Sequence, residues 1–450
     1  MKILFYFLIG FLLAFAITSN WDNSTTTKTT SIPELKNPGF KDITSQSGID
    51  YIQHAIYYQI DDQSYLRGEL QGLFSGGADA ADYDNDGDLD LFVTRLDNTN
   101  ILYENQEGKF IDISEKVKLN KKTNGNKAKW LDVNNDGWQD LFISTIGDNK
   151  DYLFMNYNGE FIEQGSKKGL GESPHLLYGF GIATGDYNND GYIDIMTSNW
   201  DRTTIRDSSK DVHGIMLQNV RGKFNQVESK LSTRMITEQG FGDVSFDSEF
   251  ADINNDGLLD LLVAADFGNS RLYQNTGEGF ADRTDESNFG LDEFGMGITT
   301  GDYNNDGLID VFVTSIYCQE EDCMEGMSGN KFYRNNGNGF DEISEQLGVE
   351  DGGWGWETEF FDYDLDGDLD LIMVMGMKEK IMGDHDFTSN ALKLWRNDQT
   401  VFTDVTEELG LTISGEGRDV IIFDYDNDGD EDIFVVRNGE NGVLFENLIL

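Results

Sequence analysis

One acidic nine-residue pattern, repeated seven times, constrains the fold of this chain more than any other feature. It reads Asp-x-(Asp/Asn)-x-Asp-Gly-x-x-Asp, and its copies begin at Asp82, Asp132, Asp186, Asp252, Asp302, Asp362 and Asp424. Each copy precedes a run that is typical of a buried β-strand, such as "LFVT" after the first copy. A solvated turn would explain one copy, but seven copies in the same context indicate a repeat protein.

A second motif recurs with the same count and predicts a hairpin. Segments such as "LYEN" and "LWRN" end at an asparagine, and in most copies a turn rich in Gly or Asn follows before another strand. These asparagines are Asn105, Asn156, Asn219, Asn275, Asn335, Asn397 and Asn447. Each repeat therefore offers four short strands, which predicts an all-β fold, a seven-bladed β-propeller of four-stranded blades. A linear β-solenoid is the competing architecture.

The two ends of the chain distinguish these architectures. The last repeat stops at "LFENLIL" without a fourth strand, while "GFKDITSQSGI" (39–49) matches "VFTDVTEELGL" (401–411). We therefore expect the N-terminal strand, about residues 39–45, to complete the C-terminal blade and close the ring. A solenoid has no reason to split one repeat between both ends, whereas closure hides two sheet edges.

The oxygen-bearing positions of the pattern match those of a calcium loop. Positions 1, 3, 5 and 9 always carry Asp or Asn, glycine at position 6 permits a sharp turn, and variable position 7 would contribute its backbone carbonyl. Flanking strands and the missing Glu at position 12 distinguish the loop from an EF-hand. We predict up to seven Ca2+ ions, which this number of protein oxygens favours over Mg2+ or Mn2+. The predicted ligands are Asp82, Asp84, Asp86, Asp88, Asp90, Asp132, Asn134, Asp136, Trp138, Asp140, Asp186, Asn188, Asp190, Tyr192, Asp194, Asp252, Asn254, Asp256, Leu258, Asp260, Asp302, Asn304, Asp306, Leu308, Asp310, Asp362, Asp364, Asp366, Asp368, Asp370, Asp424, Asp426, Asp428, Asp430 and Asp432.

The net charge excludes several classes of partner. The 450 residues carry a formal net charge of −50 at pH 7. This charge argues against nucleic acid and anionic lipid, which need a basic protein surface. Seven divalent ions would offset less than a third of it, so the remaining acid is expected on a solvated exterior.

The N-terminus resembles an export signal. One lysine precedes an apolar run from Ile3 to Ile17, which is short for a membrane span and contains the small-x-small sequence Ala14-Phe15-Ala16. We predict a signal peptide at 1–17, with an uncleaved anchor as the alternative, then a Ser/Thr-rich linker at 18–38 and the propeller at 39–450. The mature protein would be a monomer without direct membrane insertion, and secreted, periplasmic or on the cell surface. In such a location we expect a local disulfide between Cys318 and Cys323.

The repeats resemble the FG-GAP/VCBS family. The resemblance rests on "FKDITSQSGIDYIQH", "GADAADYDNDGDLDLFV" and "LYEN…GKFIDIS", and it covers residues 39–450. It extends to the seven-bladed propeller of integrin α-subunits, and more closely to exported bacterial proteins of the cartilage acidic protein type. The resemblance implies the fold and the calcium loops but no particular activity. Such proteins often carry a further C-terminal module, whose function is not carried over here because the chain ends at Leu450.

Unusually long loops predict where a ligand binds. In the integrin-like arrangement, partners dock on the face opposite the calcium loops. Three repeats carry about ten extra residues there, at 200–213, 317–330 and 377–390, and another insertion lies at 51–71. Long loops on one face favour a binding surface over decorative insertions. The expected contacts to an extracellular glycan or protein ligand are Trp200, Arg202, Arg206, His213, Lys378, Lys380 and His385.

Catalysis has less support than binding. None of His54, His175, His213 and His385 lies in a recognisable nucleophile or zinc motif. We therefore favour a secreted or cell-surface calcium-binding module for binding or adhesion over a propeller-scaffolded carbohydrate-active enzyme, a polysaccharide lyase or hydrolase. The enzyme would need acids, Arg or Lys near the central axis. Trp354 and Trp356 are expected to pack in the first strand of their repeat rather than to form a sugar platform.

Overall fold

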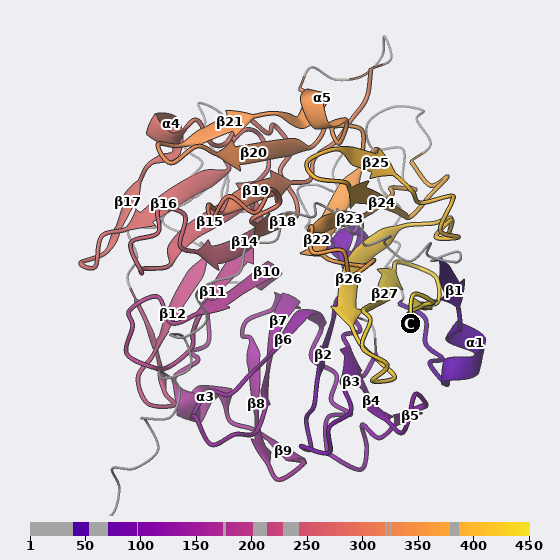
Figure 1. Ribbon diagram of the computed structural model, residues 1–450. Helices are drawn as coiled ribbons and strands as arrows, with labels where there is room; N and C mark the ends of the chain where they lie inside the picture. The colour runs from indigo at the N-terminus through magenta and orange to yellow at the C-terminus, as the bar shows by residue number, and fades with distance from the viewer. Residues whose placement is uncertain are drawn as a thin grey trace, which may run out of the picture. The chain divides into compact units, whose positions relative to one another are not determined.

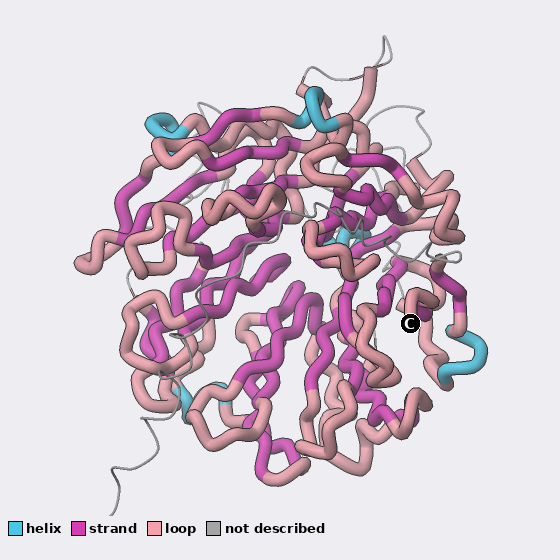
Figure 2. The backbone as a smooth tube through the Cα atoms, viewed as in Figure 1, coloured by secondary structure: helices cyan, strands magenta, loops and turns pink. Residues whose placement is uncertain are grey.

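The computed structural model describes residues 39–53, 71–96, 98–173, 177–200, 214–227, 243–319, 323, 326–378 and 387–450. The chain divides into two units, Met1–Lys36 and Asn37–Leu450, and everything below concerns the second. The predicted signal peptide and linker lie outside the described residues. The described part is almost entirely strand and loop (Figure 2). Its helices have four residues each: α1 (Thr44–Ser47), α3 (Gly165–Lys168), α4 (Thr284–Ser287), α5 (Ser344–Leu347) and the 3-10 helix η1 (Gln71–Phe74).

The strands form antiparallel four-stranded units, one for each copy of the acidic pattern. In chain order of the pattern they are β2 (Ala78–Ala81), β3 (Asp90–Val93), β4 (Ile101–Asn105) and β5 (Phe110–Asp112); β6 (Gly125–Leu131), β7 (Asp140–Asp148), β8 (Tyr152–Tyr157) and β9 (Glu160–Glu163); β10 (Leu177–Gly185), β11 (Asp194–Asn199), β12 (Ile215–Asn219) and β13 (Phe224–Gln226); β14 (Ser245–Ala251), β15 (Asp260–Ala265), β16 (Arg271–Asn275) and β17 (Phe280–Asp282); β18 (Ile298–Gly301), β19 (Asp310–Val313), β20 (Lys331–Asn335) and β21 (Phe340–Glu342); β22 (Gly355–Phe361), β23 (Asp370–Met375), β24 (Leu392–Asn397) and β25 (Phe402–Asp404); and β26 (Gly417–Phe423), β27 (Asp432–Arg437), β28 (Val443–Asn447) and β1 (Phe40–Asp42). The second and third units also pair through β7 and β10.

The last unit is completed from the other end of the chain, as predicted. β1 pairs with β28, in a register that places Phe40 opposite Asn447 and Asp42 opposite Phe445. The first strands then follow one another around a centre, in the order β2, β6, β10, β14, β18, β22 and β26, and β26 contacts β2 again. Figure 1 shows β10, β14, β22 and β26 near this centre and β5, β9, β17 and β21 away from it. The fold is therefore an all-β propeller, and the solenoid is excluded.

The second strands explain the apolar runs that follow each acidic copy. Leu91, Phe92 and Val93 in β3 are fully buried, because adjacent units cover both faces of the sheet. Trp354 and Trp356 are also buried, at 3% and 5% exposure, and they pack at the start of β22 as predicted. The acidic loops connect the first and second strands of each unit, so all seven leave the sheets at equivalent places.

Candidate metal centres

The aspartate at position 1 organises each acidic loop. In the first loop, Asp82 Oδ1 accepts the Asp86 N–H and Asp82 Oδ2 accepts the Gly87 N–H, each at 3.0 Å. The same two bonds recur in the other six loops. At position 5, Asp86 Oδ1 accepts the N–H of Asp88, and this bond also occurs in every copy. The loops thus share one conformation, held by aspartates that bond to nearby backbone.

Two positions in each loop require a left-handed backbone. Gly87 at position 6 has φ 101°, and its missing Cβ would meet nothing within 4 Å, so the backbone angle and not crowding selects glycine. Asn85 at position 4 has φ 61°, and asparagine tolerates this region better than most residues. The corresponding residue of the sixth loop is Leu365, which adopts φ 57°.

The aspartate at position 9 is buried where the second strand begins. Asp90 is 1% exposed; its Oδ1 accepts the Asn105 N–H at 2.8 Å, and its Oδ2 accepts the Tyr83 N–H at 3.2 Å. Burial raises the pKa of Asp90 to about 8, and it raises the pKa of position 9 in the other loops to between about 6 and about 8. A neighbouring cation would therefore stabilise the ionised carboxylates.

In four of the loops, position 3 supplies a buried oxygen that has no partner among the described residues. These oxygens are the Oδ1 atoms of Asp84, Asn188, Asp364 and Asp426. Three loops bring carboxylate oxygens within 4.8 Å of one another, in the groups Asp82, Asp84 and Asp86; Asp362, Asp364 and Asp370; and Asp424, Asp426 and Asp432. Buried oxygens without partners, beside converging carboxylates, are the donor set of a hard divalent cation. The residues of these loops therefore fit a metal ion.

The acidic side chains at position 7 bond to neighbouring segments. Asp88 Oδ1 accepts Asn427 Nδ2 at 2.8 Å, and Asp368 Oδ1 accepts Asn305 Nδ2 at 3.0 Å. Asp430 Oδ2 accepts the N–H of Leu450 at 3.0 Å. The side chains of Asp88 and Asp368 are therefore engaged by neighbouring segments, which leaves their backbone carbonyls for an ion, whereas Asp430 Oδ1 is buried and accepts no hydrogen bond from the described residues.

Asparagine side chains at position 4 link each loop to the next. Asn85 Nδ2 donates to the Gly137 carbonyl at 3.2 Å, and the same bond joins loops two to three, three to four, four to five and five to six. Asn427 links the seventh loop to the first through Asp88. Leu365 has no amide to donate, so the junction between the sixth and seventh loops lacks this bond.

The asparagines that end the third strands link the loops in the opposite direction. Asn156 Nδ2 donates to the carbonyl of Tyr83, at position 2 of the preceding loop, at 2.7 Å. The equivalent bond is present in all seven units, and Asn105 closes the circle by donating to Tyr425. These asparagines therefore have a role that the hairpin signature of their motif did not predict. Each one links its own unit to the acidic loop of the preceding unit by a hydrogen bond.

The predicted ligand face is only partly within the described residues. Arg202, Arg206, His213, Lys380 and His385 lie outside them. The predicted disulfide between Cys318 and Cys323 is present, and Lys378 is exposed. The prediction for Trp200 needs correction, because Trp200 is 3% exposed and its Nε1 donates to Asp266 Oδ2 at 3.0 Å. Its large apolar ring packs inside the propeller and is not presented to a ligand.

Sequence reasoning missed a group of charged residues at the propeller axis. They lie five and three residues before position 1 of the acidic pattern, and they include Lys127, Lys129 and six acids. Aligning the repeats on position 1 would have shown these two columns, each of which has one lysine and three acids among its seven residues.

Comparisons with known proteins agree with this architecture. The family model described as FG-GAP-like repeat matches residues 82–143, 132–197 and 252–313. The chain matches none of the curated proteins. Two solved structures of BBS1N in complex with ARL6DN, one soaked with lead and one with mercury, are similar in fold. Their identities are 7% and 8%, they cover 92% and 91% of this chain and 96% and 97% of theirs, and both TM-scores are 0.50.

A third structure, of an Agrocybe aegerita lectin that specifically recognises non-reducing terminal N-acetylglucosamine, is 14% identical. It covers 83% of this chain and 90% of its own, with a TM-score of 0.43.

Within the described residues, no helix combines the length and the apolar character that a bilayer span requires.

Proposed function

We propose that this chain, a β-propeller of FG-GAP-like repeats, is a secreted or cell-surface binding module with seven blades that Ca2+ stabilises. The carrying observation comes from the first, sixth and seventh acidic loops, in which a buried position-3 oxygen without a described partner lies beside converging carboxylates. A propeller that needed only turns at these places would not bury carboxylates whose pKa values burial has raised.

Each loop would hold one ion through side-chain oxygens at positions 1, 3, 5 and 9 and the carbonyl at position 7. The ion would supply the positive charge that the buried carboxylates lack. In the first loop these residues are Asp82, Asp84, Asp86, Asp90 and, through its carbonyl, Asp88. The hydrogen bonds from backbone N–H groups to Asp82 and Asp86 already orient these side chains. Little rearrangement is therefore needed for binding.

Calcium removal tests this assignment. If free Ca2+ is about tenfold above Kd, each site adds about 1.4 kcal/mol to the free energy of unfolding, and seven sites add on the order of 10 kcal/mol. This is comparable to the whole stability of a typical domain. We expect elemental analysis to find up to seven Ca2+ ions per chain, and excess EDTA to lower the melting temperature strongly. An unchanged melting temperature in EDTA would refute a structural role for Ca2+.

A matched pair of variants assigns the effect to the loops. Asp252→Ala removes position 1 of the fourth loop, and we expect it to lose one Ca2+ per chain and to reduce the calcium-dependent part of the melting temperature. Asp285→Ala removes an exposed acid in α4 and should change neither. Equal losses in both variants would mean that Ca2+ associates with the acidic surface and not with the loops.

The proposed ligand is an extracellular glycan or protein. The BBS1N propeller, solved in complex with the protein ARL6DN, offers an analogy for protein binding by such a fold. Calcium-loaded protein should be probed on glycan and extracellular protein arrays and, in parallel, incubated with polysaccharides while new chain ends are measured. Binding without product supports the binding module. Product formation that requires the protein would overturn it in favour of a carbohydrate-active enzyme.

A further inference from the structure

Two layers of charged side chains surround the axis of the propeller. The plug-side layer, named after Phe74 of η1, which packs across this end of the axis, consists of residues five positions before position 1 of the acidic pattern. The loop-side layer consists of residues three positions before position 1. The plug-side layer contains Lys127, Asp247, Glu357 and Asp419. The loop-side layer contains Asp79, Lys129, Glu249 and Glu359. Each layer therefore has three acids and one lysine, so negative charge is in excess at the axis.

These layers surround a cavity of about 220 Å3. All seven first strands contribute residues to its wall, which includes both lysines and all of the layer acids except Asp79. A water molecule occupies about 30 Å3 in the liquid, so the cavity has room for several waters or for one small organic molecule.

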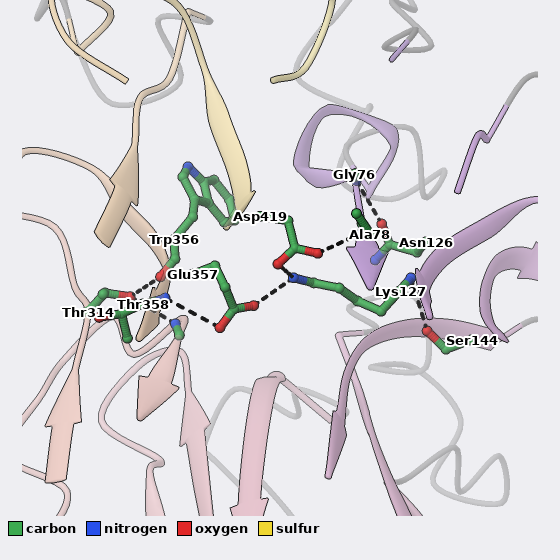
Figure 3. Close-up of polar contacts among 12 residues, drawn as sticks. Gly76, Ala78, Asn126, Lys127, Ser144, Thr314, Trp356, Glu357, Thr358 and Asp419 are labelled. Atoms are coloured by element: carbon green, nitrogen blue, oxygen red, sulfur yellow. Dashed lines mark hydrogen bonds and ion pairs between the residues drawn. The ribbon is translucent and has the colours of Figure 1, made fainter. Parts of the chain in front are cut away.

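Lys127 shows how the plug-side layer is neutralised. Its Nζ lies 2.6 Å from Glu357 Oε2 and 2.7 Å from Asp419 Oδ1, and these acids come from the sixth and seventh units (Figure 3). Asp419 Oδ2 also accepts the N–H of Ala78 at 2.9 Å. One ammonium group thus joins two carboxylates from different strands. The charges at this axis therefore suit a ligand that carries an ammonium group.

The loop-side layer is incompletely neutralised. Lys129 lies beside Asp79, whose charge raises the pKa of Lys129. Glu249 Oε1 accepts the Thr300 hydroxyl at 2.9 Å, but Glu249 Oε2 is buried and accepts no hydrogen bond from the described residues. The hydroxyl oxygen of Ser248, a residue 5% exposed in the same wall, is likewise without a described partner. A buried carboxylate oxygen without a donor is costly, so a cationic donor would be favoured here.

The environment of the two glutamates supports this reading. Burial raises the pKa of Glu249 to about 8, and burial together with the charge of Glu357 raises the pKa of Glu359 to about 7. The charge of Lys129 lowers the pKa of both glutamates, but it does not cancel the effect of their burial.

The cavity is closed at one end and reaches toward the acidic loops at the other. Phe74 of η1 packs against Phe180, Phe246 and Trp356, each one residue before the plug-side layer, with ring centroids 5.2 to 6.4 Å apart. On the opposite side the wall extends to Thr184, two residues from position 1 of its loop. A ligand would thus arrive past a strongly negative surface, which attracts cations and repels anions.

We propose that the axial cavity binds a small organic ammonium ion, such as a linear diamine, with one ammonium group held by Glu249 and Glu359. A bare metal ion is the weaker candidate. In the described part of the chain, groups of three or more acidic side chains whose oxygens lie within 4.8 Å of one another occur only in the acidic loops, so the axial acids offer a metal ion no such group. A single ammonium nitrogen joins two carboxylates in the neighbouring layer, where Lys127 Nζ lies 2.6 Å from Glu357 and 2.7 Å from Asp419.

Isothermal titration calorimetry of the full chain with 1,4-diaminobutane tests the proposal. Saturating CaCl2 keeps the acidic loops occupied, so a failure of this site is distinguishable from a failure of calcium binding. We expect one diamine per chain, no heat from the neutral analogue 1,4-butanediol, and an affinity at least tenfold weaker in Glu249→Gln. Glu345→Gln, which removes an exposed acid in α5, should bind like the unmodified protein.

A rescue experiment provides an independent readout. Lys127→Met leaves Glu357 and Asp419 without their ammonium group, and 1,4-diaminobutane should raise its melting temperature more than it raises that of the unmodified protein. Three results would overturn the proposal: no binding, several diamines per chain with equal affinity in Glu249→Gln, or an additional bound metal ion that Glu249→Gln removes. The second would mean surface association, and the third a metal site.

Discussion

Replacing Leu365 with asparagine should stabilise the propeller. Leu365 stands at position 4 of the sixth acidic loop, where the other six loops have asparagine. It adopts φ 57° and leaves 48% of its surface exposed, so it has an unfavourable backbone conformation and little burial to compensate. An asparagine there would face the carbonyl of Gly429 in the next loop, as Asn255 faces that of Gly307 at 3.0 Å.

Two contributions set the magnitude. A left-handed conformation costs an ordinary residue about 1 to 2 kcal/mol, and asparagine avoids part of this cost. A hydrogen bond at an exposed site contributes about 0.5 to 1 kcal/mol. The expected gain in the free energy of unfolding is therefore about 1 to 2 kcal/mol. At about 2.1 cal/mol/K of unfolding entropy per residue, a unit the size of Asn37–Leu450 should melt about 1 to 2 °C higher.

The assay compares Leu365→Asn with the reverse substitution at position 4 of the fourth loop, Asn255→Leu. Asn255→Leu removes an equivalent link and imposes the same unfavourable backbone on leucine, so it should lower the melting temperature by a similar amount. Both variants are measured by thermal unfolding in saturating Ca2+, so that occupancy of the loops stays fixed. If Leu365→Asn were neutral or destabilising while Asn255→Leu was destabilising, Leu365 would owe its place to packing and the reasoning would be wrong.

Two further variants and one chemical treatment probe other parts of the fold by the same thermal assay. Phe74→Ala removes the aromatic contacts at the end of the axis and should lower the free energy of unfolding by about 3 to 5 kcal/mol. A decrease below about 1 kcal/mol would contradict the burial of Phe74. Asn156→Ala removes three side-chain hydrogen bonds of a fully buried residue and should cost about 3 kcal/mol; a surface-like effect would refute its linking role. Opening the disulfide between Cys318 and Cys323 with reductant should cost at most about 2 kcal/mol, because the residues are only 5 apart; global unfolding would contradict this.

The fold was predictable because its signals are local and repeated. The acidic pattern sets a turn between two strands, and the N-terminal segment around Phe40 resembles residues 401–411, which contain the fourth strand of the sixth unit. Pairing of β1 with β28 follows from that likeness alone. The role of Asn156 and its equivalents was not predictable in this way, because their bonds reach the preceding unit, 73 residues earlier for Asn156 and Tyr83.

The axial site escaped prediction for a related reason. Lys127 and its partner Glu357 are 230 residues apart, and only closure of the ring brings them together. Trp200 was misassigned because an aromatic residue at the start of a long loop is typical of a ligand contact. Its burial depends on Phe74 of η1 and on Phe246 of the fourth unit, which are distant in the sequence. Long-range contacts at a ring centre leave no trace in local periodicity.

Variation between repeats then becomes informative about function. Positions 1, 5, 6 and 9 of the acidic pattern are the same in every copy, since each copy must build the same loop. The column that contains Lys127 and Glu357 differs from copy to copy, and it also contains glycines such as Gly297, where a Cβ would collide with the next strand. A propeller that needed only to pack its axis would have used small or apolar residues throughout this column. Burying opposite charges in this column has a desolvation cost, which Lys127 offsets only in part. We therefore look for a ligand at the axis as well as at the long loops.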